Sequence, residues 1–317
     1  MTRPRVARKN VHLDIVDPSI SVVVPTYYRP MELSELLDSI LGQTRKPMEI
    51  IIVDDTPIPS IKLVCEQYEK AFQEIGVNLL YVKRDIARWR GRANPKERSI
   101  SSARNFGAII AKGDIVQFID SDIVLTPSYL REVQKTFEEH SEALGVEGIT
   151  IPIQRPPAGV GENAVETIAK LFFLFHPSRN TCKHFEFPLF LDKEIRCEWF
   201  NGPDMAFRKG VLSQFQFDEN LVKYSFMECV LFTGLIDKAY PGRLILTPEA
   251  KFYENRSEEG RMKKSEIRIH KDRCRKYVLT KLFGSRGLLL FGWQNLGLLV
   301  LRTIGRIRGK DFDNAMM

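Results

Sequence analysis

Two carboxylates, Asp120 and Asp122, stand one residue apart directly after a short apolar run at residues 115–119. Such a run is typical of a strand buried in a parallel sheet. In open α/β sheets, ligands collect outside the carboxyl ends of the strands. Two acids there can bind a hard divalent cation through oxygen, and that cation can bind a diphosphate. The alternative is an ordinary turn, in which Asp and Ser are favoured.

Strands and helices are expected to alternate around this run. Uninterrupted apolar or β-branched residues predict strands over 20–26, 49–55, 78–83, 115–119, 146–153 and 243–253. Apolar residues at helical spacing predict helices over 31–41, 61–75, 99–111, 130–137 and 226–238. Four alternations in about 110 residues predict an α/β fold, with a Rossmann-like, mostly parallel sheet flanked by helices. Acids at or near the strand ends, at 54–55, 114, 120 and 122, are expected to line one rim of this sheet.

The composition is that of a globular protein, with 44% hydrophobic and 27% charged residues among 317. Its five cysteines form no CxxC pair, which argues against a zinc site or a disulfide framework and fits a reducing compartment. No apolar segment follows the basic N-terminus, so we expect no signal peptide and a cytoplasmic protein.

Basicity is concentrated in the tail: from Lys251 onward there are 16 Lys/Arg and 7 Asp/Glu. Residues 258–284 predict a basic helix, and the apolar stretch 287–301 is shorter than the roughly 20 residues of a spanning helix. We therefore expect peripheral membrane contact through residues 285–310. The alternative is a helix packed on the core or on a second subunit. An apolar stripe without interleaved aromatics argues against nucleic-acid binding.

Five stretches together resemble the family-2 glycosyltransferases of the GT-A fold, over roughly residues 20–255. In order they are VVVPTY at 22–27, IIIVDD at 50–55, SSARNFG at 101–107, KGDIVQFIDSD at 112–122 and NGPDMAFRK at 201–209. The resemblance implies an inverting, metal-assisted transfer of a sugar from a nucleotide-sugar donor to a hydroxyl. We expect the donor to be a UDP-sugar, the acceptor a glycan or a lipid-linked molecule, and the metal Mg²⁺ or Mn²⁺.

The chain is expected to divide into three parts. Residues 1–19 are basic, polar and non-periodic and are expected to form a lead-in, and the resemblance implies a GT-A domain over residues 20–255. Its nucleotide-binding half covers residues 20–125 and its acceptor half residues 126–255. Residues 256–317 form basic amphipathic helices.

Donor-binding residues carry over by position in the motifs. The nucleotide pocket is lined by Pro25, Thr26 and Tyr27, and either Asp54 or Asp55 accepts a hydrogen bond from the base or ribose. Arg104, next to Asn105, is a cation able to reach the diphosphate, although it could instead only pair with one of these acids. Asp120 lies nearer the ribose, Asp122 is the more direct metal ligand, and Gly107 suits close helix packing.

The catalytic base is where the chain departs from the resemblance. The family places a Glu-Asp pair at the start of a helix, whereas this sequence has Glu228-Cys229. Glu228 can serve alone, because a base needs only reach and a suitable pKa. Asp204 is the alternative base, and a slow or inactive enzyme is the third possibility.

A second departure follows the next strand. Six residues beyond Pro248, where the family commonly has a metal-binding His, the chain has Glu254. A glutamate still suits Mg²⁺ or Mn²⁺, and a solvent-facing acid is the alternative. Trp199, before the acceptor loop at 201–204, could stack on a sugar or simply pack.

Two other classes of function compete with sugar transfer. A nucleotidyltransferase would carry a glycine-rich, basic loop after its first strand, and residues 25–30 contain no glycine. A non-catalytic, glycosyltransferase-like scaffold is suggested by Cys229.

Overall fold

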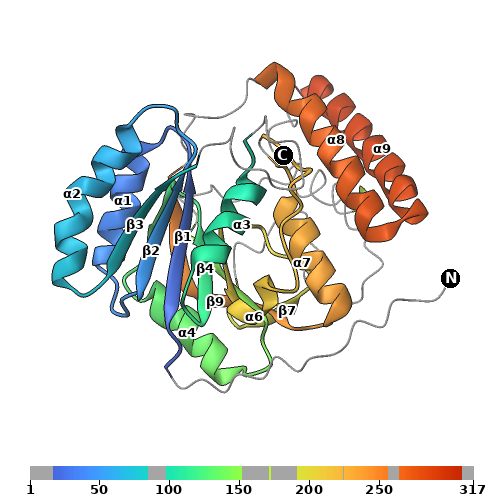
Figure 1. Ribbon diagram of the computed structural model, residues 1–317. Coiled ribbons are helices and arrows are strands. Elements are labelled where there is room, and N and C mark those ends of the chain that lie inside the picture. Colours follow the sequence, from blue (N-terminus) through green and yellow to red (C-terminus); the bar gives the residue numbers. More distant parts are fainter. Residues whose placement is uncertain are drawn as a thin grey trace.

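The computed structural model describes residues 17–84, 98–151, 171–172, 191–223, 225–255 and 264–308. Within them, one nine-stranded mixed sheet forms the centre, with helices on both faces (Figure 1). The strand order is β3-β2-β1-β4-β8-β6-β9-β5, and β7 pairs beside β9. Most of the N-terminal lead-in and much of residues 154–200 lie outside the described residues.

The first half of the sheet is parallel, as expected. Its elements are β1 (Ile20–Thr26), α1 (Pro30–Leu41), β2 (Glu49–Asp54), α2 (Ser60–Glu74), β3 (Asn78–Lys83), α3 (Ile100–Ile110) and β4 (Ile115–Ile119). β1 lies between β2 and β4 and pairs in parallel with both. These bounds agree with the expected ones to within a residue or so, because long β-branched runs define the strands.

The second half of the sheet is mixed. Its elements are β5 (Ile123–Leu125), α4 (Tyr129–Glu139), β6 (Gly145–Thr150), β7 (Ile195–Cys197), β8 (Asp204–Arg208), α6 (Lys209–Leu212), α7 (Glu228–Ala239) and β9 (Leu244–Glu254). β8 runs antiparallel to both β4 and β6, and β5 and β7 run antiparallel to β9. The parallel arrangement therefore holds for β3-β2-β1-β4, whereas the rest of the sheet is mixed, with β6 and β9 paired in parallel and β8, β5 and β7 paired antiparallel to their neighbours.

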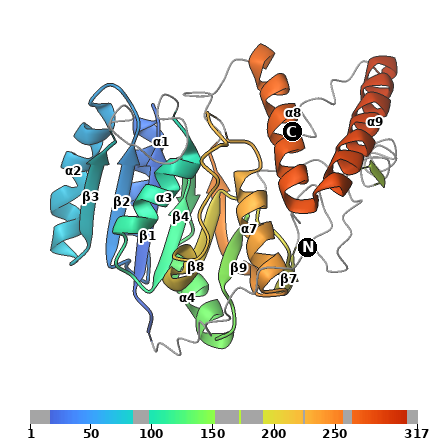
Figure 2. The ribbon, with the colours of Figure 1, turned by 45° about the vertical axis from the view of Figure 1, so that its right-hand side comes forward.

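Two apolar layers cover the two faces of the sheet. Val22 and Val24 of β1 pack with α1, α2 and α4, and Val23 between them packs with α3 and α7. The alternation follows from the strand geometry, in which successive side chains point to opposite faces. Figure 2 shows α3 and α7 in front of the sheet and α2 at its β3 edge.

The C-terminal segment forms a helical hairpin of α8 (Lys264–Phe283) and α9 (Ser285–Arg308). α8 packs on α7 through Cys274, Val278 and Leu282, which meet Leu221 and Leu231. α9 lies on the outer side of α8, away from the sheet (Figures 1 and 2).

One acid does not lie where we expected. Asp114 precedes β4, so it lies at the opposite end of that strand from Asp120. Its carboxylate accepts hydrogen bonds from the backbone N–H (3.0 Å) and hydroxyl (2.7 Å) of Ser19. Asp114 therefore fastens the start of β1 and is not part of the strand-end rim.

Replacing Gly107 with alanine should destabilise the fold. Gly107 lies where α3 crosses β1, and an added Cβ would fall 2.3 Å from Val23 Cγ1. We expect overpacking to cost about 1–3 kcal/mol in the free energy of unfolding, measured by urea denaturation. Gly292→Ala on α9 is the control, because its Cβ meets nothing within 4 Å and alanine favours helix by up to about 1 kcal/mol. Equal stability of Gly107→Ala and the wild type would contradict this packing.

Candidate active site

A fully buried arginine, Arg104 on α3, joins three segments of the candidate site. Its guanidinium donates to Glu228 Oε1, Asp120 Oδ1 and the Gly202 carbonyl, each at 2.8 Å. The fork geometry of a guanidinium allows one cation to serve several acceptors. A buried charge is costly unless it is paired and hydrogen-bonded, so this contact constrains all three acceptors.

Glu228 is the first residue of α7, and its side chain is almost buried. Burial raises the pKa of this carboxyl to about 7, although the Arg104 cation opposes the shift. A carboxylate with a pKa near the working pH is suited to accept a proton. The structure thus brings the sequence-predicted base onto the same arginine as Asp120.

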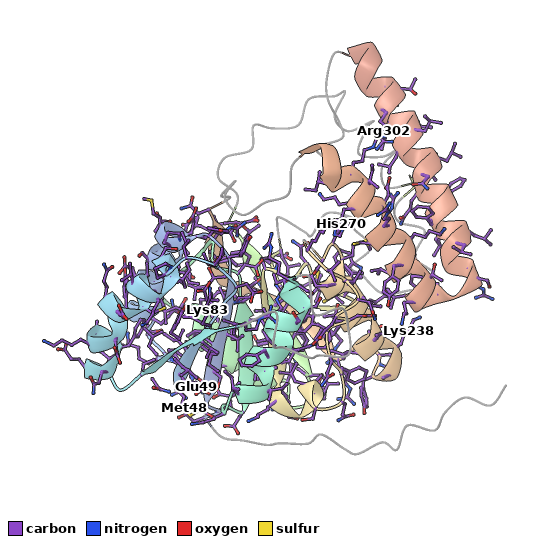
Figure 3. The ribbon with its side chains drawn as sticks, turned by 45° about the horizontal axis from the view of Figure 1, so that its top comes forward. Met48, Glu49, Lys83, Lys238, His270 and Arg302 are labelled. Carbon is purple, nitrogen blue, oxygen red and sulfur yellow. The ribbon has the colours of Figure 1, made fainter. Side chains whose placement is uncertain are left out.

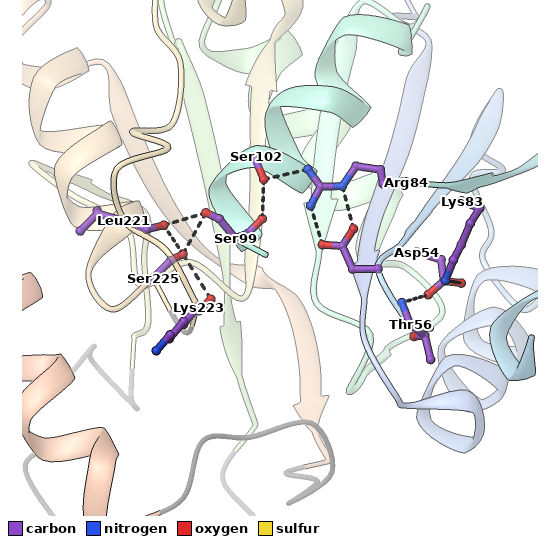
Figure 4. Close-up of polar contacts among 10 residues, drawn as sticks. Asp54, Thr56, Lys83, Arg84, Ser99, Ser102, Leu221, Lys223 and Ser225 are labelled. Atoms are coloured by element: carbon purple, nitrogen blue, oxygen red, sulfur yellow. Dashed lines mark hydrogen bonds and ion pairs between the residues drawn. The ribbon is translucent and has the colours of Figure 1, made fainter. Parts of the chain in front are cut away.

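The backbone before Glu228 is strained. Lys223, Ser225 and Met227 all have positive φ angles, between 47° and 65°. The Ser225 hydroxyl donates to the Leu221 carbonyl at 2.6 Å and lies 3.2 Å from the hydroxyl of Ser99, at the start of α3 (Figure 4). Residues other than glycine adopt positive φ angles at a cost in free energy, and contacts with the surrounding structure must offset that cost. The entry to α7 is therefore held in place by α3.

The Cys229 thiol makes a structural hydrogen bond and is not suited to act as a base. Its thiol donates to the Asn201 carbonyl, with Sγ and O 3.1 Å apart, and burial raises its pKa well above the ordinary value. A neutral thiol cannot take a proton from a hydroxyl. Gly202 packs against it with φ 106°, and a Cβ on Gly202 would fall 2.8 Å from Cys229 Sγ.

Sequence reasoning missed Glu147, a fully buried acid in β6. Its carboxylate accepts the backbone N–H groups of Asn201 (2.9 Å) and Gly202 (2.7 Å). Since the Gly202 carbonyl in turn accepts from Arg104, Glu147 fixes the loop that helps to hold the arginine. A lone glutamate in a predicted buried strand is the signal that could have revealed it.

Asp204 opens β8 and is almost inaccessible, with 1% of its surface exposed. One oxygen accepts from the Tyr129 hydroxyl (2.6 Å) and the Gly148 N–H (2.9 Å), whereas Oδ1 has no hydrogen-bond partner among the described residues. Burial raises the pKa to about 8, and the negative charges of Asp120 and Glu254 add to the shift. Asp204 is therefore near Asp120, and its raised pKa favours the protonated form.

The acids proposed for the metal lie at one end of the sheet. Asp122 pairs with Arg29 at 2.7 Å, and its carbonyl accepts the N–H of Asn255 at 2.7 Å. Glu254 lies beside Ile123, the residue that follows Asp122, in the β5–β9 ladder. No group of three His, Cys, Asp or Glu that could hold a metal ion occurs in the described part of the chain.

The donor set nevertheless suits a divalent cation. Mg²⁺ is usually bound by one or two carboxylates together with substrate phosphates and water, rather than by a complete protein cage. Asp120 and Asp122 provide such a pair, and Asp122 already faces a cationic group in Arg29. Oxygen ligands of this kind fit Mg²⁺ or Mn²⁺.

Asp54 is completely buried and has protein partners on both oxygens. It accepts from the Thr56 N–H (2.7 Å) and from Lys83 Nζ (3.3 Å) (Figure 4), and also from the Tyr81 hydroxyl (2.8 Å). These contacts tie the end of β2 to β3. A role in binding a base or ribose stays a prediction for this residue.

Asp55 forms a two-point ion pair with Arg84. The carboxylate oxygens accept from Nε at 2.7 Å and Nη2 at 2.5 Å, and Arg84 Nη1 donates to the Ser102 hydroxyl at 2.7 Å. This paired geometry is among the stronger charge-assisted contacts. Arg84 thereby links the end of β2 to α3 (Figure 4).

The end of β1 presents an aromatic surface beside a buried hydroxyl. The Arg98 guanidinium lies 3.5 Å from the ring centroid of Tyr27, a cation–π contact. Thr26 Oγ1 is buried without a hydrogen-bond partner among the described residues, and Pro25 is buried within the strand. These features are compatible with the predicted nucleotide pocket.

The Asn105 amide makes its hydrogen bonds with residues 217–219. Its amide nitrogen donates to the Phe217 carbonyl and Glu219 Oε1, and its amide oxygen accepts the Phe217 N–H, all at 2.9 Å. The structure therefore places it as a fastening residue between α3 and residues 217–219. Trp199 is half-buried, and its contact with a sugar stays a prediction.

The profile of Glycosyl transferase family 2 matches residues 21–154. The chain is 27% identical over 145 residues to the minor teichoic acid biosynthesis protein GgaB of Bacillus subtilis, which covers 45% of this chain and 14% of that protein. It is 31% identical over 135 residues to the glucosyl-dolichyl phosphate glucuronosyltransferase of Haloferax volcanii, and the match covers 42% of this chain and 38% of that protein. The matches thus span well under half the length of these curated relatives.

Solved structures share the fold at lower identity. The S. aureus TarS fragment 1–349 with UDP-GlcNAc superposes with a TM-score of 0.55 and 19% identity, covering 90% of this chain and 74% of that one. The mannosyltransferase PcManGT of Pyrobaculum calidifontis, with GDP-Man and Mn²⁺, superposes with a TM-score of 0.58 at 16% identity. The superposition covers 96% of this chain and 79% of that one. The chain therefore has a GT-A-type fold with the expected motifs in place, and its residues 21–154 are similar to glycosyl transferase family 2.

Proposed function

We propose that this glycosyltransferase moves a sugar from a nucleotide sugar to an acceptor hydroxyl with inversion, with Glu228 as the base. The observation that carries the proposal is Arg104, which contacts both Glu228 and Asp120. It ties the proton acceptor to the end of the sheet where a diphosphate and a cation would lie. The proposal assigns residues 20–125 to the donor and residues 126–255 to the acceptor.

Charge on the leaving group is the main demand of the reaction. Breaking the glycosidic bond leaves a nucleoside diphosphate, whose negative charge must be stabilised. A Mg²⁺ or Mn²⁺ ion bound by Asp120 and Asp122, with Glu254 beside them, would supply that stabilisation. Arg104 adds a positive charge, and Glu228 accepts the proton of the attacking hydroxyl.

The donor and acceptor classes come from chemistry and from relatives. TarS and PcManGT were solved with UDP-GlcNAc and GDP-Man, so both are proteins that bind nucleotide sugars. A further relative, the poly(ribitol-phosphate) beta-glucosyltransferase of Bacillus spizizenii, is 33% identical over 105 residues. We propose a UDP-sugar as the donor and a surface glycan or a lipid-linked molecule as the acceptor.

The hairpin of α8 and α9 supports a membrane contact. Leu288, Leu289, Leu296 and Leu299 are exposed within one sector of α9, between 47% and 76% of their surface. Residues Ser285–Ile304 form a helix that is long and apolar enough to cross a membrane. This helix is longer than the apolar stretch 287–301 expected from the sequence. The core helix of a soluble protein can meet the same criterion of length and composition. We favour a helix lying in the interface at the cytoplasmic face, because basic residues flank the stripe. Figure 3 shows Arg302 on α9 and His270 on α8, both well away from the sheet.

Glu228→Gln should abolish most of the donor hydrolysis. We expect a fall of about 10²–10⁴-fold, the usual contribution of a positioned base, since glutamine keeps the shape but cannot take a proton. The assay measures release of nucleoside diphosphate from a panel of UDP-, GDP- and dTDP-sugars with Mn²⁺ or Mg²⁺. Because the Glu228 carboxyl must be ionised and its pKa is about 7, the wild-type rate should rise as the pH increases through 7.

The controls separate the competing interpretations. Glu74→Gln, an exposed carboxyl on α2, should retain the wild-type rate. If Glu228→Gln is fully active and Asp204→Asn is inactive, Asp204 is the base instead of Glu228. Wild-type protein that binds a donor with metal but never cleaves it would support the scaffold alternative.

Leu289→Glu combined with Leu299→Glu should release the protein from anionic vesicles. Each leucine can bury enough apolar surface to contribute about 1.5–3 kcal/mol, so loss of both should weaken binding more than tenfold in a flotation assay. Leu63→Glu on α2, with 54% of its surface exposed, is the matched control and should bind like the wild type. If the double variant binds the vesicles as tightly as the wild type, α9 is not the membrane contact.

A further inference from the structure

The ion pair between Arg29 and Asp122 has no place in the proposed chemistry. Arg29 lies in the loop between β1 and α1, directly before the first residue of α1. Its Nη1 is 2.7 Å from Asp122 Oδ2, and the two side chains are only 18% and 7% exposed. A metal ligand predicted from the sequence is therefore already paired with a cation from the protein itself.

A divalent metal bound to Asp122 would lie beside this guanidinium. Both are cations, and Arg29 Nη1, 2.7 Å from Oδ2, already uses one acceptor site of the carboxylate and repels a second cation there. Metal binding is therefore opposed as long as Arg29 stays on Asp122. Breaking a buried pair is expensive when it leaves one charge without a partner.

The surroundings of Arg29 decide how expensive this displacement is. The positive charge of Arg29 acts on Arg98, whose pKa it helps to lower, and on Asp120. Asp120 is already bound by Arg104. A displaced Arg29 would thus stay close to other cations, Arg98 and Arg104.

A nucleoside diphosphate supplies what the displaced arginine lacks. Its phosphate oxygens accept the paired N–H groups of a guanidinium, and its charge offsets the crowding of cations. We propose that Arg29 competes with the divalent metal for Asp122, so that the metal binds together with the nucleoside diphosphate and not before it. This inference rests on the proposed donor binding at the rim of the sheet.

The test measures binding of Mn²⁺ by electron paramagnetic resonance, with and without UDP or GDP. The wild type should bind Mn²⁺ weakly alone and at least tenfold more tightly with a nucleoside diphosphate. Arg29→Gln should bind Mn²⁺ alone about tenfold more tightly than the wild type, and the gain from the nucleotide should shrink. Arg29→Lys, which keeps the charge but not the fork, should lie between the two.

Two further variants make the result specific. Lys83→Gln also removes one positive charge from a strand end, where Lys83 pairs with Asp54 at 3.3 Å (Figures 3 and 4). It should leave the affinity for Mn²⁺ alone unchanged, which excludes a general effect of net charge. Asp122→Asn should lose Mn²⁺ binding in both the wild-type and the Arg29→Gln background. Thermal unfolding of each variant confirms that it is folded.

The outcomes separate this inference from the proposed function. If the wild type binds neither UDP nor GDP with Mn²⁺, both the proposed donor binding and the inference fail. If the nucleotide does tighten Mn²⁺ binding but Arg29→Gln matches the wild type, only the competition by Arg29 is overturned. Mn²⁺ binding that survives in Asp122→Asn would overturn it as well.

Discussion

The burial of one cation, Arg104, is the constraint on which the candidate site depends. Its guanidinium needs protein acceptors because it is buried, and the three that it has come from the end of β4, the loop before β8 and the start of α7. None of these segments is close to another in sequence. The site therefore forms only when the parallel half and the mixed half of the sheet are packed together, and α3 is the element that both halves share.

The loop at residues 201–202 shows how that constraint extends outward. Glu147 holds its backbone N–H groups from one side, and Cys229 donates to the Asn201 carbonyl from the other. An ionised aspartate at position 229 would face that carbonyl as an anion, without a proton to donate. The departure at Cys229 is thus consistent with the position of the loop, and it leaves Glu228 as the carboxylate of the pair.

The parallel strands could be predicted because long β-branched runs leave few other structures open to them. β5, β7 and β8 escaped detection, since strands of three to five residues are defined by their partners rather than by their own pattern. The resemblance placed Arg104, Asp120 and Glu228 in the site before any contact was known. It could not place Glu147 or Arg29, because the partner of a charged residue depends on tertiary packing.

Charge balance then explains why the acids of the site behave differently. Glu228 has an arginine beside it and a pKa of about 7, whereas Asp204 has only neutral donors and a pKa of about 8. A base must be ionised and able to meet its substrate, and Asp204 at 1% exposure meets neither condition at neutral pH. The same fold thereby gives two buried acids different surroundings, an arginine cation for Glu228 and only neutral donors for Asp204.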